Sequence, residues 1–569
     1  MRLACVQLQA YDLQNAEEGL SHALAMTERA LASSPNLILL PECTYPAYFL
    51  AGYGSARLRP PHEVLESFAR LARRGNCYLA LGLVEPGGEG ILHNSAVMLA
   101  PDGQVVARGH KHFLWHFDSR WFAPGSAPAL ADTPWGKIGM FVCADGRLPE
   151  VPRLLALQGA RLQLDLTGWV SSGRDPARLS NPQAEYMLRV RALENRCWMA
   201  AANKVGMEAG RVVYCGLSQI ISPDGQVVAR AGSTGPQVIL ADIPLDEPVP
   251  PLWPDFDPRR DRQPPAYALL AAPGPEAPVT RPAPAPQVTR PGPAPGVPSA
   301  PSAPEAAPAR SAPHVVRLAA LQLAGRESLD DLLRGLTYEG VTAAVTSVLP
   351  DAPAPGRVAQ DGGELPVKVV AWRTGRQVVA RLETPEATVT VDAALAPERR
   401  VYSTPAGTLG IMLDREALLP EVARVLALAG AEWLAWPCSL PADMVEAVAR
   451  TRAAENKVFV VAANAPHPAL AGPLTPEAGM ARGKGQSPGG GGPAEETEGG
   501  ASLLVDPDGR ILAQAFAGTE QSVAGQAHLC LARHKIIVPG TDAFAHRQPW
   551  LYAALAGAAA QTKAPPPGG

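Results

Sequence analysis

The sequence predicts an α/β fold that occurs twice in one chain, and three observations support this prediction. First, short apolar runs typical of strands alternate with helical patterns, as expected where helices cover the faces of a sheet. Second, a series of short motifs in the first 270 residues returns in the same order after residue 314. Third, the Pro- and Ala-rich stretch between the two series has too little apolar surface to fold.

The alternation of strands and helices is clearest in the first 160 residues. Apolar residues recur at helical spacing in some segments, and others are short continuous apolar runs that predict buried strands. In order, we expect a strand over 1–8, a helix over 16–31, a strand over 37–40, a helix over 62–73, and strands over 78–84 and 136–142, followed by a helix over 149–158.

The internal repeat rests on six ordered motif matches, which indicate a tandem duplication rather than two unrelated α/β domains. The matched segments are 2–8 with 317–323, 103–108 with 375–381, 148–151 with 419–422, 191–195 with 452–456, 222–225 with 506–509, and 262–264 with 547–549.

These boundaries predict two domains with low-complexity connections. A chain of 569 residues is also too long for a single core. We expect a first domain over 1–250 with a closing segment to about 270, a linker over 271–314, a second domain over 315–555 with a disordered loop at about 466–500, and a flexible tail over 556–569.

Composition excludes several classes of partner. The 50 Lys and Arg against 54 Asp and Glu give a net charge of −4, so nothing favours nucleic acid or an anionic membrane. The eight cysteines are scattered without C-x-x-C or clustered His, which argues against structural zinc and a disulfide framework. We find no signal peptide and no apolar run long enough to span a membrane. We therefore expect a cytoplasmic protein that uses no metal or cofactor.

Cys143 is the first candidate for chemistry, because it follows an apolar strand and precedes a turn and a helical pattern. Backbone N–H groups near a helix N-terminus favour a thiolate and an oxyanion. The competing interpretation is a core cysteine that only packs. Asp145 and Arg147 are expected to fix the turn after Cys143 rather than to react.

Two further ionisable residues also follow strands. Glu42 comes after the run 36–41, and Lys111 comes after the strand-like residues 105–107. A glutamate can take the thiol proton, and a lysine can stabilise a tetrahedral oxyanion together with the backbone N–H of Ala144. Taken alone, Glu42 could cap a turn and Lys111 could be an ordinary solvated lysine.

With Glu42, Lys111 and Cys143 in this order, the chain resembles the nitrilase superfamily of carbon–nitrogen hydrolases over residues 1 to about 270. Supporting motifs are 93–96, 191–195 and 259–264. The resemblance implies a four-layer α-β-β-α sandwich, present twice in this chain. It also implies a Glu-Lys-Cys triad and subunits that pair through helices, either within the chain as a pseudo-dimer or in a homo-oligomer.

The resemblance suggests further residues around the substrate. Related enzymes often carry a second glutamate about seven residues after the lysine, and here the shorter Asp118 stands in that place. Asp118 either orients the substrate or caps its loop. Arg120 could bind a substrate carboxylate or pair with Asp118, and Trp169 is another candidate for positioning the substrate.

The motif Cys-x-Asp-x-Arg-x-Pro-Glu at 143–150 is similar to the amidase and carbamoylase branches, whereas nitrile-cleaving members usually show Cys-Trp-Glu. We therefore expect hydrolysis of a small-molecule amide through a cysteine thioester, with N-carbamoyl hydrolysis second and nitrile hydrolysis third. Two further hypotheses are transfer of the acyl group to an amine and a non-catalytic scaffold.

The second domain is predicted to keep the fold and lose the reaction. The repeat places Asp414 at the position of the nucleophile and Thr384 near that of the lysine, with Asp351 the nearest analogue of the glutamate. An aspartate cannot form a thioester, and threonine is not a cationic donor. Cys438 is expected to be a packing residue.

Overall fold

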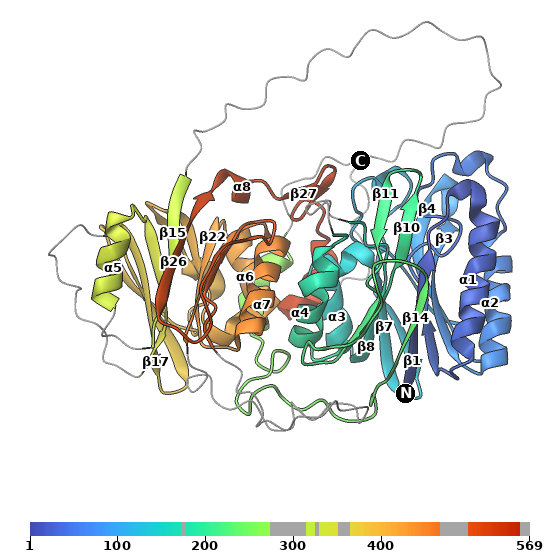
Figure 1. Ribbon diagram of the computed structural model, residues 1–569, viewed down its shortest axis with the longest axis horizontal. Coiled ribbons are helices and arrows are strands. Elements are labelled where there is room, and N and C mark those ends of the chain that lie inside the picture. The colour runs from blue at the N-terminus through green and yellow to red at the C-terminus, as the bar shows by residue number, and fades with distance from the viewer. Residues whose placement is uncertain (172–177, 273–314, 325–328, 351–364, 467–498, 558–569) are drawn as a thin grey trace, which may run out of the picture.

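The structure is a computed structural model, and two bodies dominate it (Figure 1). No helix in the described part of the chain is both long and apolar enough to cross a membrane. The predicted linker, the loop at about 466–500 and the tail lie almost entirely outside the described residues, as does Asp351. The described residues are 1–171, 178–272, 315–324, 329–350, 365–466 and 499–557.

The first half is a four-layer α-β-β-α sandwich, which confirms the predicted fold class. One sheet has the order β11-β10-β1-β2-β3-β4-β5, with β14 also paired to β1, and the other has the order β13-β12-β9-β8-β7-β6. Helices α1 and α2 pack on the first sheet, and α3 and α4 pack on the second (Figure 1). The elements are β1 (Arg2–Gln9), α1 (Ala16–Leu31), β2 (Leu37–Leu39), α2 (Pro61–Gly75), β3 (Tyr78–Pro86), β4 (Leu92–Leu99), β5 (Val105–His110), β6 (Ala129–Thr133), β7 (Gly136–Val142), α3 (Glu150–Leu157), β8 (Ala160–Leu166), α4 (Leu188–Asn195), β9 (Trp198–Ala202), β10 (Lys204–Glu208), β11 (Val212–Cys215), β12 (Gln219–Ile221), β13 (Val227–Arg230) and β14 (Gln237–Asp242).

Helix α2 shows why these segments form where the sequence predicts. It begins at Pro61, whose missing N–H costs nothing in the first turn of a helix. It ends at Asn76, which adopts the left-handed conformation and donates its N–H to Ala72 and Arg73 carbonyls. Its apolar face, including Val64 and Phe68, is buried against the first sheet.

The second half repeats the two-sheet arrangement. Its sheets have the orders β19-β18-β17-β16-β15-β26 and β20-β21-β22-β23-β24-β25. Helix α5 lies outside the first sheet, and α6 and α7 lie against the second (Figure 1). The elements are β15 (Val315–Gln322), α5 (Leu329–Tyr338), β16 (Ala343–Leu349), β17 (Val367–Thr374), β18 (Gln377–Glu383), β19 (Thr388–Val391), β20 (Val401–Thr404), β21 (Gly407–Ile411), α6 (Pro420–Leu428), β22 (Trp433–Cys438), α7 (Ala442–Asn456), β23 (Phe459–Asn464), β24 (Leu503–Val505), β25 (Ile511–Gln514), β26 (Gln521–His528), α8 (Cys530–Arg533), β27 (Ile536–Val538), β28 (Thr541–Asp542) and α9 (Pro549–Tyr552).

Strand direction brings the candidate residues to one end of the first half. Strands β1, β2 and β3 are parallel, and β5 runs the same way because it is the second antiparallel neighbour beyond β3. Glu42 and Lys111 therefore follow strands that end at the same edge of their sheet. Cys143 follows β7 in the facing sheet, and the core between the two sheets includes its side chain.

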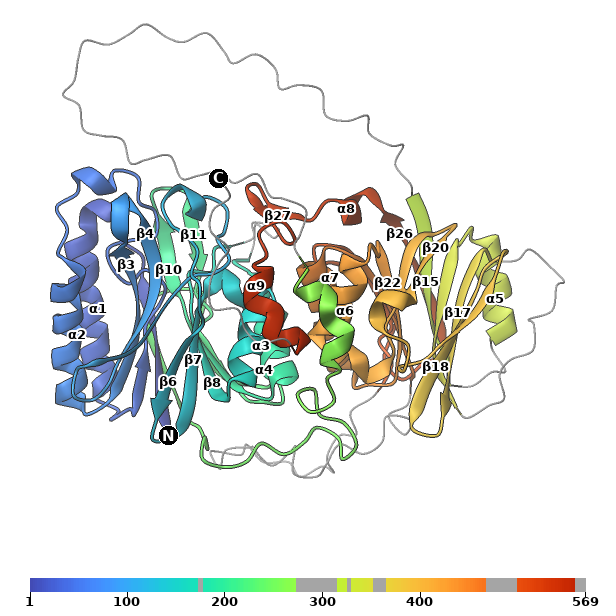
Figure 2. The same cartoon turned by 180° about the vertical axis from the view of Figure 1, so that it is seen from behind.

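The two halves pack against each other through helices α3 and α4 of the first half and α6 and α7 of the second (Figures 1 and 2). One continuous apolar cluster contains residues from both sides, such as Leu154 and Val190 of the first half and Val422 and Val448 of the second. The helical layer of each half is thus covered by that of the other half within one chain.

Buried charges cross this interface in a pseudo-twofold pattern. Arg191 contacts Glu194 at 2.6 Å and Glu455 at 2.5 Å, and Arg452 contacts Glu455 at 2.6 Å and Glu194 at 2.5 Å. All four side chains are fully buried. The two Arg-Ala-x-Glu-Asn motifs of the repeat are therefore each other's partners.

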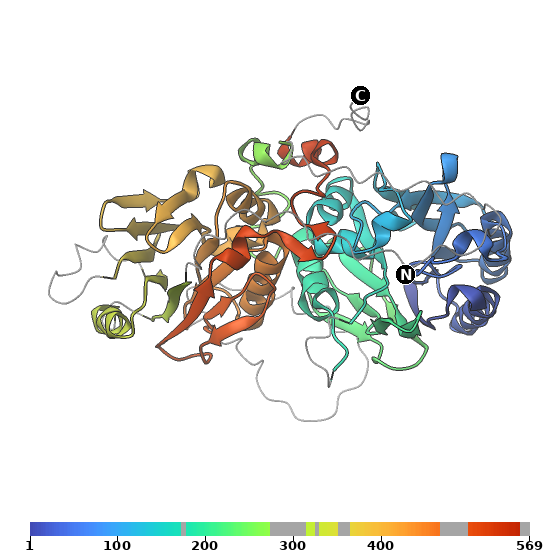
Figure 3. The same cartoon turned by 90° about the horizontal axis from the view of Figure 1, so that it is seen from above.

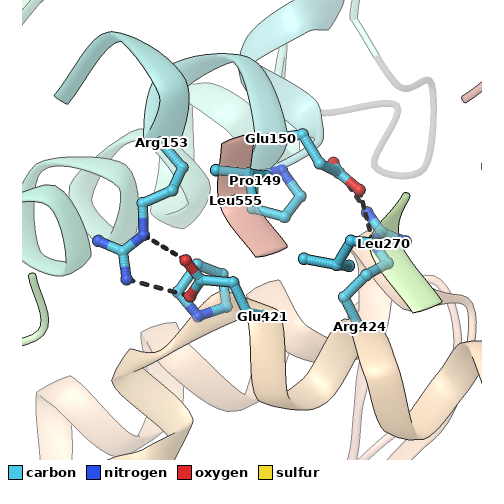
Figure 4. Close-up of a pocket in the computed structure, with 8 residues that line it drawn as sticks. Pro149, Glu150, Arg153, Leu270, Glu421, Arg424 and Leu555 are labelled. Atoms are coloured by element: carbon cyan, nitrogen blue, oxygen red, sulfur yellow. Dashed lines mark hydrogen bonds and ion pairs between the residues drawn. The ribbon is translucent and has the colours of Figure 1, made fainter. Parts of the chain in front are cut away.

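A second set of ion pairs lines a pocket between the halves (Figure 4). Arg153 contacts Glu421 at 2.9 Å, and Arg424 contacts Glu150 at 3.0 Å. Leu270 and Leu555, one from each closing segment, complete the lining together with two prolines.

The C-terminal segment of each half packs against the other half. Arg262 of the first half reaches Glu421 at 2.6 Å, and Arg547 of the second half reaches Glu150 at 3.6 Å. The helical turns that follow these arginines lie side by side where the halves meet (Figure 3). Each half thus fastens the helical layer of the other.

Candidate active site

The nucleophile candidate lies on a strained turn. Cys143 directly follows β7 and has a φ of +48°, which is unusual for a residue with a side chain. Its N–H donates to Asp165 at 2.9 Å, and its carbonyl accepts a hydrogen bond from Gln183 at 2.8 Å. The residue is 8% exposed, so the thiol is almost fully shielded from solvent.

Asp145 fixes this turn, as the sequence predicted. Its carboxylate accepts the N–H of Val142 at 3.1 Å, and also those of His112 at 2.9 Å and Phe113 at 2.7 Å. One buried carboxylate therefore ties the turn after the thiol to the loop that carries Lys111.

Glu42 and Lys111 are in direct contact. The Lys111 ammonium lies 2.8 Å from Glu42 Oε1, and both side chains are almost fully buried. Oε1 also accepts a hydrogen bond from Asn94 at 2.6 Å, whereas Oε2 has no hydrogen-bond partner among the described residues. Gly168 approaches this second oxygen so closely that a side chain there would collide with it. The glutamate is thus held by one oxygen and keeps the other available for a proton.

Asp118 caps its loop, one of the two roles that the sequence left open, and its role in orienting the substrate stays a prediction. Its Oδ2 lies 2.7 Å from the Lys111 ammonium and accepts the Trp115 N–H at 2.8 Å. Its Oδ1 accepts the Tyr48 hydroxyl at 2.6 Å. The aspartate therefore caps its loop and also contacts the lysine. Burial opposes a charged Lys111, but the carboxylates of Asp118 and Glu42 raise its pKa well above the ordinary value, which keeps it cationic.

The other two candidates lie in different surroundings. Trp169 is fully buried in the core that contains Cys143, and its indole N–H has no acceptor within the described chain. The Arg120 side chain is exposed. Asp118 contacts Lys111 and Tyr48 instead of Arg120. The other alternative for Arg120, binding of a substrate carboxylate, stays a prediction.

Sequence reasoning missed the buried polar groups behind these residues. Glu208 accepts the N–H groups of Tyr48 at 2.8 Å and Phe49 at 2.5 Å, as well as the Tyr214 hydroxyl at 2.8 Å. It thereby orients the segment that carries Tyr48 toward Asp118. The sequence signal for this contact is the charged Glu208 in strand β10. A charge in a strand does not indicate which other segment it binds.

Comparisons with known proteins identify the family of the chain. A family model described as carbon-nitrogen hydrolase matches residues 2–248 and 369–532, which is more than half of the chain. The chain belongs to the carbon-nitrogen hydrolase family. Both halves of this hydrolase are members, which confirms the duplication predicted from the repeat.

Individual relatives match one half of the hydrolase. It is 27% identical over 253 residues to the omega-amidase NIT2 of Mus musculus, covering 43% of this chain and 88% of that relative. It is 29% identical over 250 residues to a nitrilase of Pyrococcus abyssi, covering 43% and 90%. Among solved structures, an amidase from Nesterenkonia sp. matches at 25% identity and a TM-score of 0.41, covering 46% of this chain and 93% of that one.

At the places that match Cys143 and Lys111, the second half of the hydrolase carries Asp414 and Thr384. Asp414 follows β21 with a φ of +45°, close to the value of Cys143, and its side chain lies 3.3 Å from Arg373. Thr384 follows β18, as Lys111 follows β5, and its hydroxyl only closes a turn with Ala387. Cys438 is buried in the apolar cluster between the halves, as predicted for a packing residue.

The protonation of Cys143 leads to a prediction about pH. Burial first, and then the nearby Glu42 carboxylate, raise the pKa of the Cys143 thiol well above its ordinary value. The thiol is therefore neutral at pH 7, and alkylation of Cys143 by iodoacetamide should still accelerate above pH 9. Glu42→Gln removes a negative charge, so the midpoint of this pH profile should move to lower pH.

The same substitution should lower amide turnover, because glutamine cannot accept the thiol proton. The pH profile is measured by quantifying the alkylated Cys143 peptide, with Glu66→Gln, an exposed helical glutamate, as the matched control. A midpoint that stays in place or rises in Glu42→Gln would contradict the assignment of Glu42 as the charge that faces the thiol.

Proposed function

We propose that the first half hydrolyses a small-molecule amide through a thioester on Cys143. The observation that carries this proposal is the buried contact of Lys111 with both Glu42 and Asp118, beside a thiol on a strained turn. The omega-amidase and nitrilase relatives support the reaction class, since both names denote cleavage of a carbon–nitrogen bond.

In the first step, Cys143 Sγ attacks the amide carbon while its proton passes to the free Oε2 of Glu42. The developing oxyanion is stabilised by the Lys111 ammonium and the Ala144 N–H. Glu42 then gives the proton to the leaving nitrogen, and ammonia or an amine departs as the thioester forms. In the second step, Glu42 takes a proton from water while the water oxygen attacks the thioester carbon. The C–S bond then breaks to release the acid, and Glu42 returns the proton to the Cys143 sulfur.

N-carbamoyl hydrolysis is the second candidate, because the motif at 143–150 is similar to the carbamoylase branch as well as to the amidase branch. Within this motif, Asp145 fixes the turn and Glu150 pairs with Arg424 at the interface between the halves, so these two residues do not select the substrate. The distinction between amide and carbamoyl substrates therefore rests with the loops over the site.

The second half is proposed to be catalytically inactive. Asp414 cannot form a thioester, and Thr384 supplies no cation. We propose that it serves instead as the partner surface of an intrachain pseudo-dimer, since its helices cover those of the first half. A cytoplasmic location is proposed as well, in keeping with eight cysteines that are all unpaired.

The proposed function is tested by incubating the full chain with small amides, N-carbamoyl compounds and nitriles while ammonia release and intact mass are followed. We expect ammonia from amides and a trapped acyl adduct that peptide mapping places on Cys143. Addition of an amine acceptor separates hydrolysis from acyl transfer by the product formed. Turnover without any adduct on Cys143, or an adduct on another residue, would contradict the thioester mechanism.

A further inference from the structure

The loop that carries Lys111 is held from two sides. On the first side it belongs to the first half, where the Lys111 N–H donates to the Asn94 carbonyl at 2.8 Å and Asp145 accepts the next two N–H groups. Farther along the loop, His116 has a φ of +50°, a conformation that surrounding contacts must maintain.

The second side comes from the other half of the chain. Gln548 donates its side-chain N–H to the His112 carbonyl at 2.9 Å. The His116 N–H donates to the Thr541 hydroxyl at 2.6 Å. Gly540 passes so close to the His116 carbonyl that a Cβ at its position would lie 3.2 Å from that oxygen. All three contacts lie in the segment between Lys111 and Asp118.

An apolar contact reaches the nucleophile turn as well. Ile537 of the second half packs against a small buried cluster formed by Phe113, Ala144 and Leu148. Ala144 is the residue after the nucleophile and, in the proposed mechanism, the donor to the oxyanion. The segment from β27 to Gln548 thus touches both the lysine loop and the thiol turn.

This segment is itself firmly attached. Lys535, just before β27, donates to the carbonyls of Asn456 at 3.2 Å and Lys457 at 3.0 Å. Arg547 is buried, pairs with Glu150 and donates to the Leu270 carbonyl. Figure 2 shows β27 and α9 lying at the junction, beside α3 of the first half.

The repeat supplies an internal comparison. Gln263 is the first-half residue that matches Gln548 in the motif Arg-Gln-Pro, and its side chain is exposed. In both halves, the arginine of the motif pairs with a glutamate of the other half. The glutamine of the second half, Gln548, also donates to the His112 carbonyl in the lysine loop. The asymmetry places the extra contact on the half that carries the thiol.

We propose that the second half, through Gln548, Thr541 and Ile537, is a positioning element that sets the lysine loop of the first half. This inference rests on the proposed function. The residues act through Lys111, Asp118 and Ala144 and touch no substrate.

The test uses the full chain with Thr541→Val and Gln548→Leu combined, and Gln263→Leu as the matched control. The Lys111 ammonium lowers the thiol pKa, so a displaced loop should move the pH midpoint of Cys143 alkylation upward. We expect kcat to fall about 10- to 100-fold, as for a misplacement of about 1 Å at a reacting centre. Gln263→Leu should match the wild type in both measurements.

The outcomes separate positioning from simple loss of stability. A lower unfolding temperature with an unchanged alkylation profile and unchanged kcat would overturn the inference alone. If the double variant does not fold, Thr541→Val is compared with Thr541→Ser, which keeps the acceptor and should behave as the wild type; equal behaviour of these two variants would also overturn it. A wild-type chain whose Cys143 resists alkylation at every pH would overturn the proposed function, and this inference with it.

Discussion

Cys143→Ala is expected to reduce amide hydrolysis roughly 10⁴- to 10⁶-fold, the scale on which loss of a covalent nucleophile acts. Alanine removes the sulfur that forms the thioester, and none of the remaining groups can replace it. Cys43 is the nearest cysteine in the sequence to Glu42, but it is buried, and desolvation raises the pKa of its thiol well above the ordinary value. The residual rate should therefore be only that supplied by substrate binding and oxyanion stabilisation, roughly 10³- to 10⁴-fold above uncatalysed hydrolysis.

The fold should survive this change, because the turn is held by backbone contacts. Asp165 accepts the N–H of residue 143 and Gln183 binds its carbonyl, and neither contact needs the side chain. Ammonia release and the unfolding temperature are measured together, with Cys530→Ala as control, since Cys530 is the partly exposed cysteine of α8. Substantial hydrolysis by a well-folded Cys143→Ala chain would eliminate the thioester route.

The sequence was a good guide to the fold because its strands and helices carry strong local signals. The helix expected over 16–31 is observed as α1 with the same limits, and the strand that ends at Val142 places Cys143 on its turn. The duplication could be predicted because its motifs recur in the same order in both halves, and one of them, Arg-Ala-x-Glu-Asn, is fully buried in each.

The candidate site could be predicted in part. Glu42, Lys111 and Cys143 each follow a strand, and strands that run in the same direction end at one edge of a sheet. The structure brings the three together, and their catalytic roles stay a prediction. Tyr48 and Glu208 could not be predicted, because their contacts join segments 160 residues apart and leave no periodic pattern in the sequence.

The meaning of the repeated Arg-Ala-x-Glu-Asn motif was also hidden from the sequence. As a pattern it only marks the duplication, because nothing in a single motif shows what it binds. In the structure, Arg191 and Glu455 belong to different copies and lie 2.5 Å apart. A motif that pairs with its own repeat is typical of an isologous interface, in which each partner supplies the same surface.

Arg191→Met should lower the free energy of unfolding by about 3–5 kcal/mol, the usual cost of leaving a buried charge without its partner. The variant would leave the carboxylates of Glu194 and Glu455 facing each other with Arg452 as their shared cation. Although burial opposes the charged form of Arg191, the two glutamates raise its pKa above the ordinary value, so the positive charge is present at every pH where the protein folds. Methionine fills a similar volume, which confines the effect to charge and hydrogen bonding.

Urea denaturation measures this change, with Arg70→Met as control. Arg70 is exposed and lies 3.9 Å from Glu66, so its loss should cost at most about 1 kcal/mol. Arg191→Met combined with Glu455→Leu should cost less than the sum of the single changes, because the second substitution removes a carboxylate that has lost one of its two arginine partners. Additive costs would show that the two side chains do not interact in solution.

The number of steps in the urea unfolding curve also tests whether the two halves are coupled. Because the apolar cluster and the charge network are shared by α3, α4, α6 and α7, the two halves should unfold in one cooperative transition. Weakening the network in Arg191→Met should then lower the stability of the second half and of the half that carries Cys143 together. Two separate transitions, with the first half unaffected, would mean that each half folds alone. A coupled loss would explain why a half without a nucleophile is kept in the chain: its helices cover charges and apolar surface that the first half cannot expose to water.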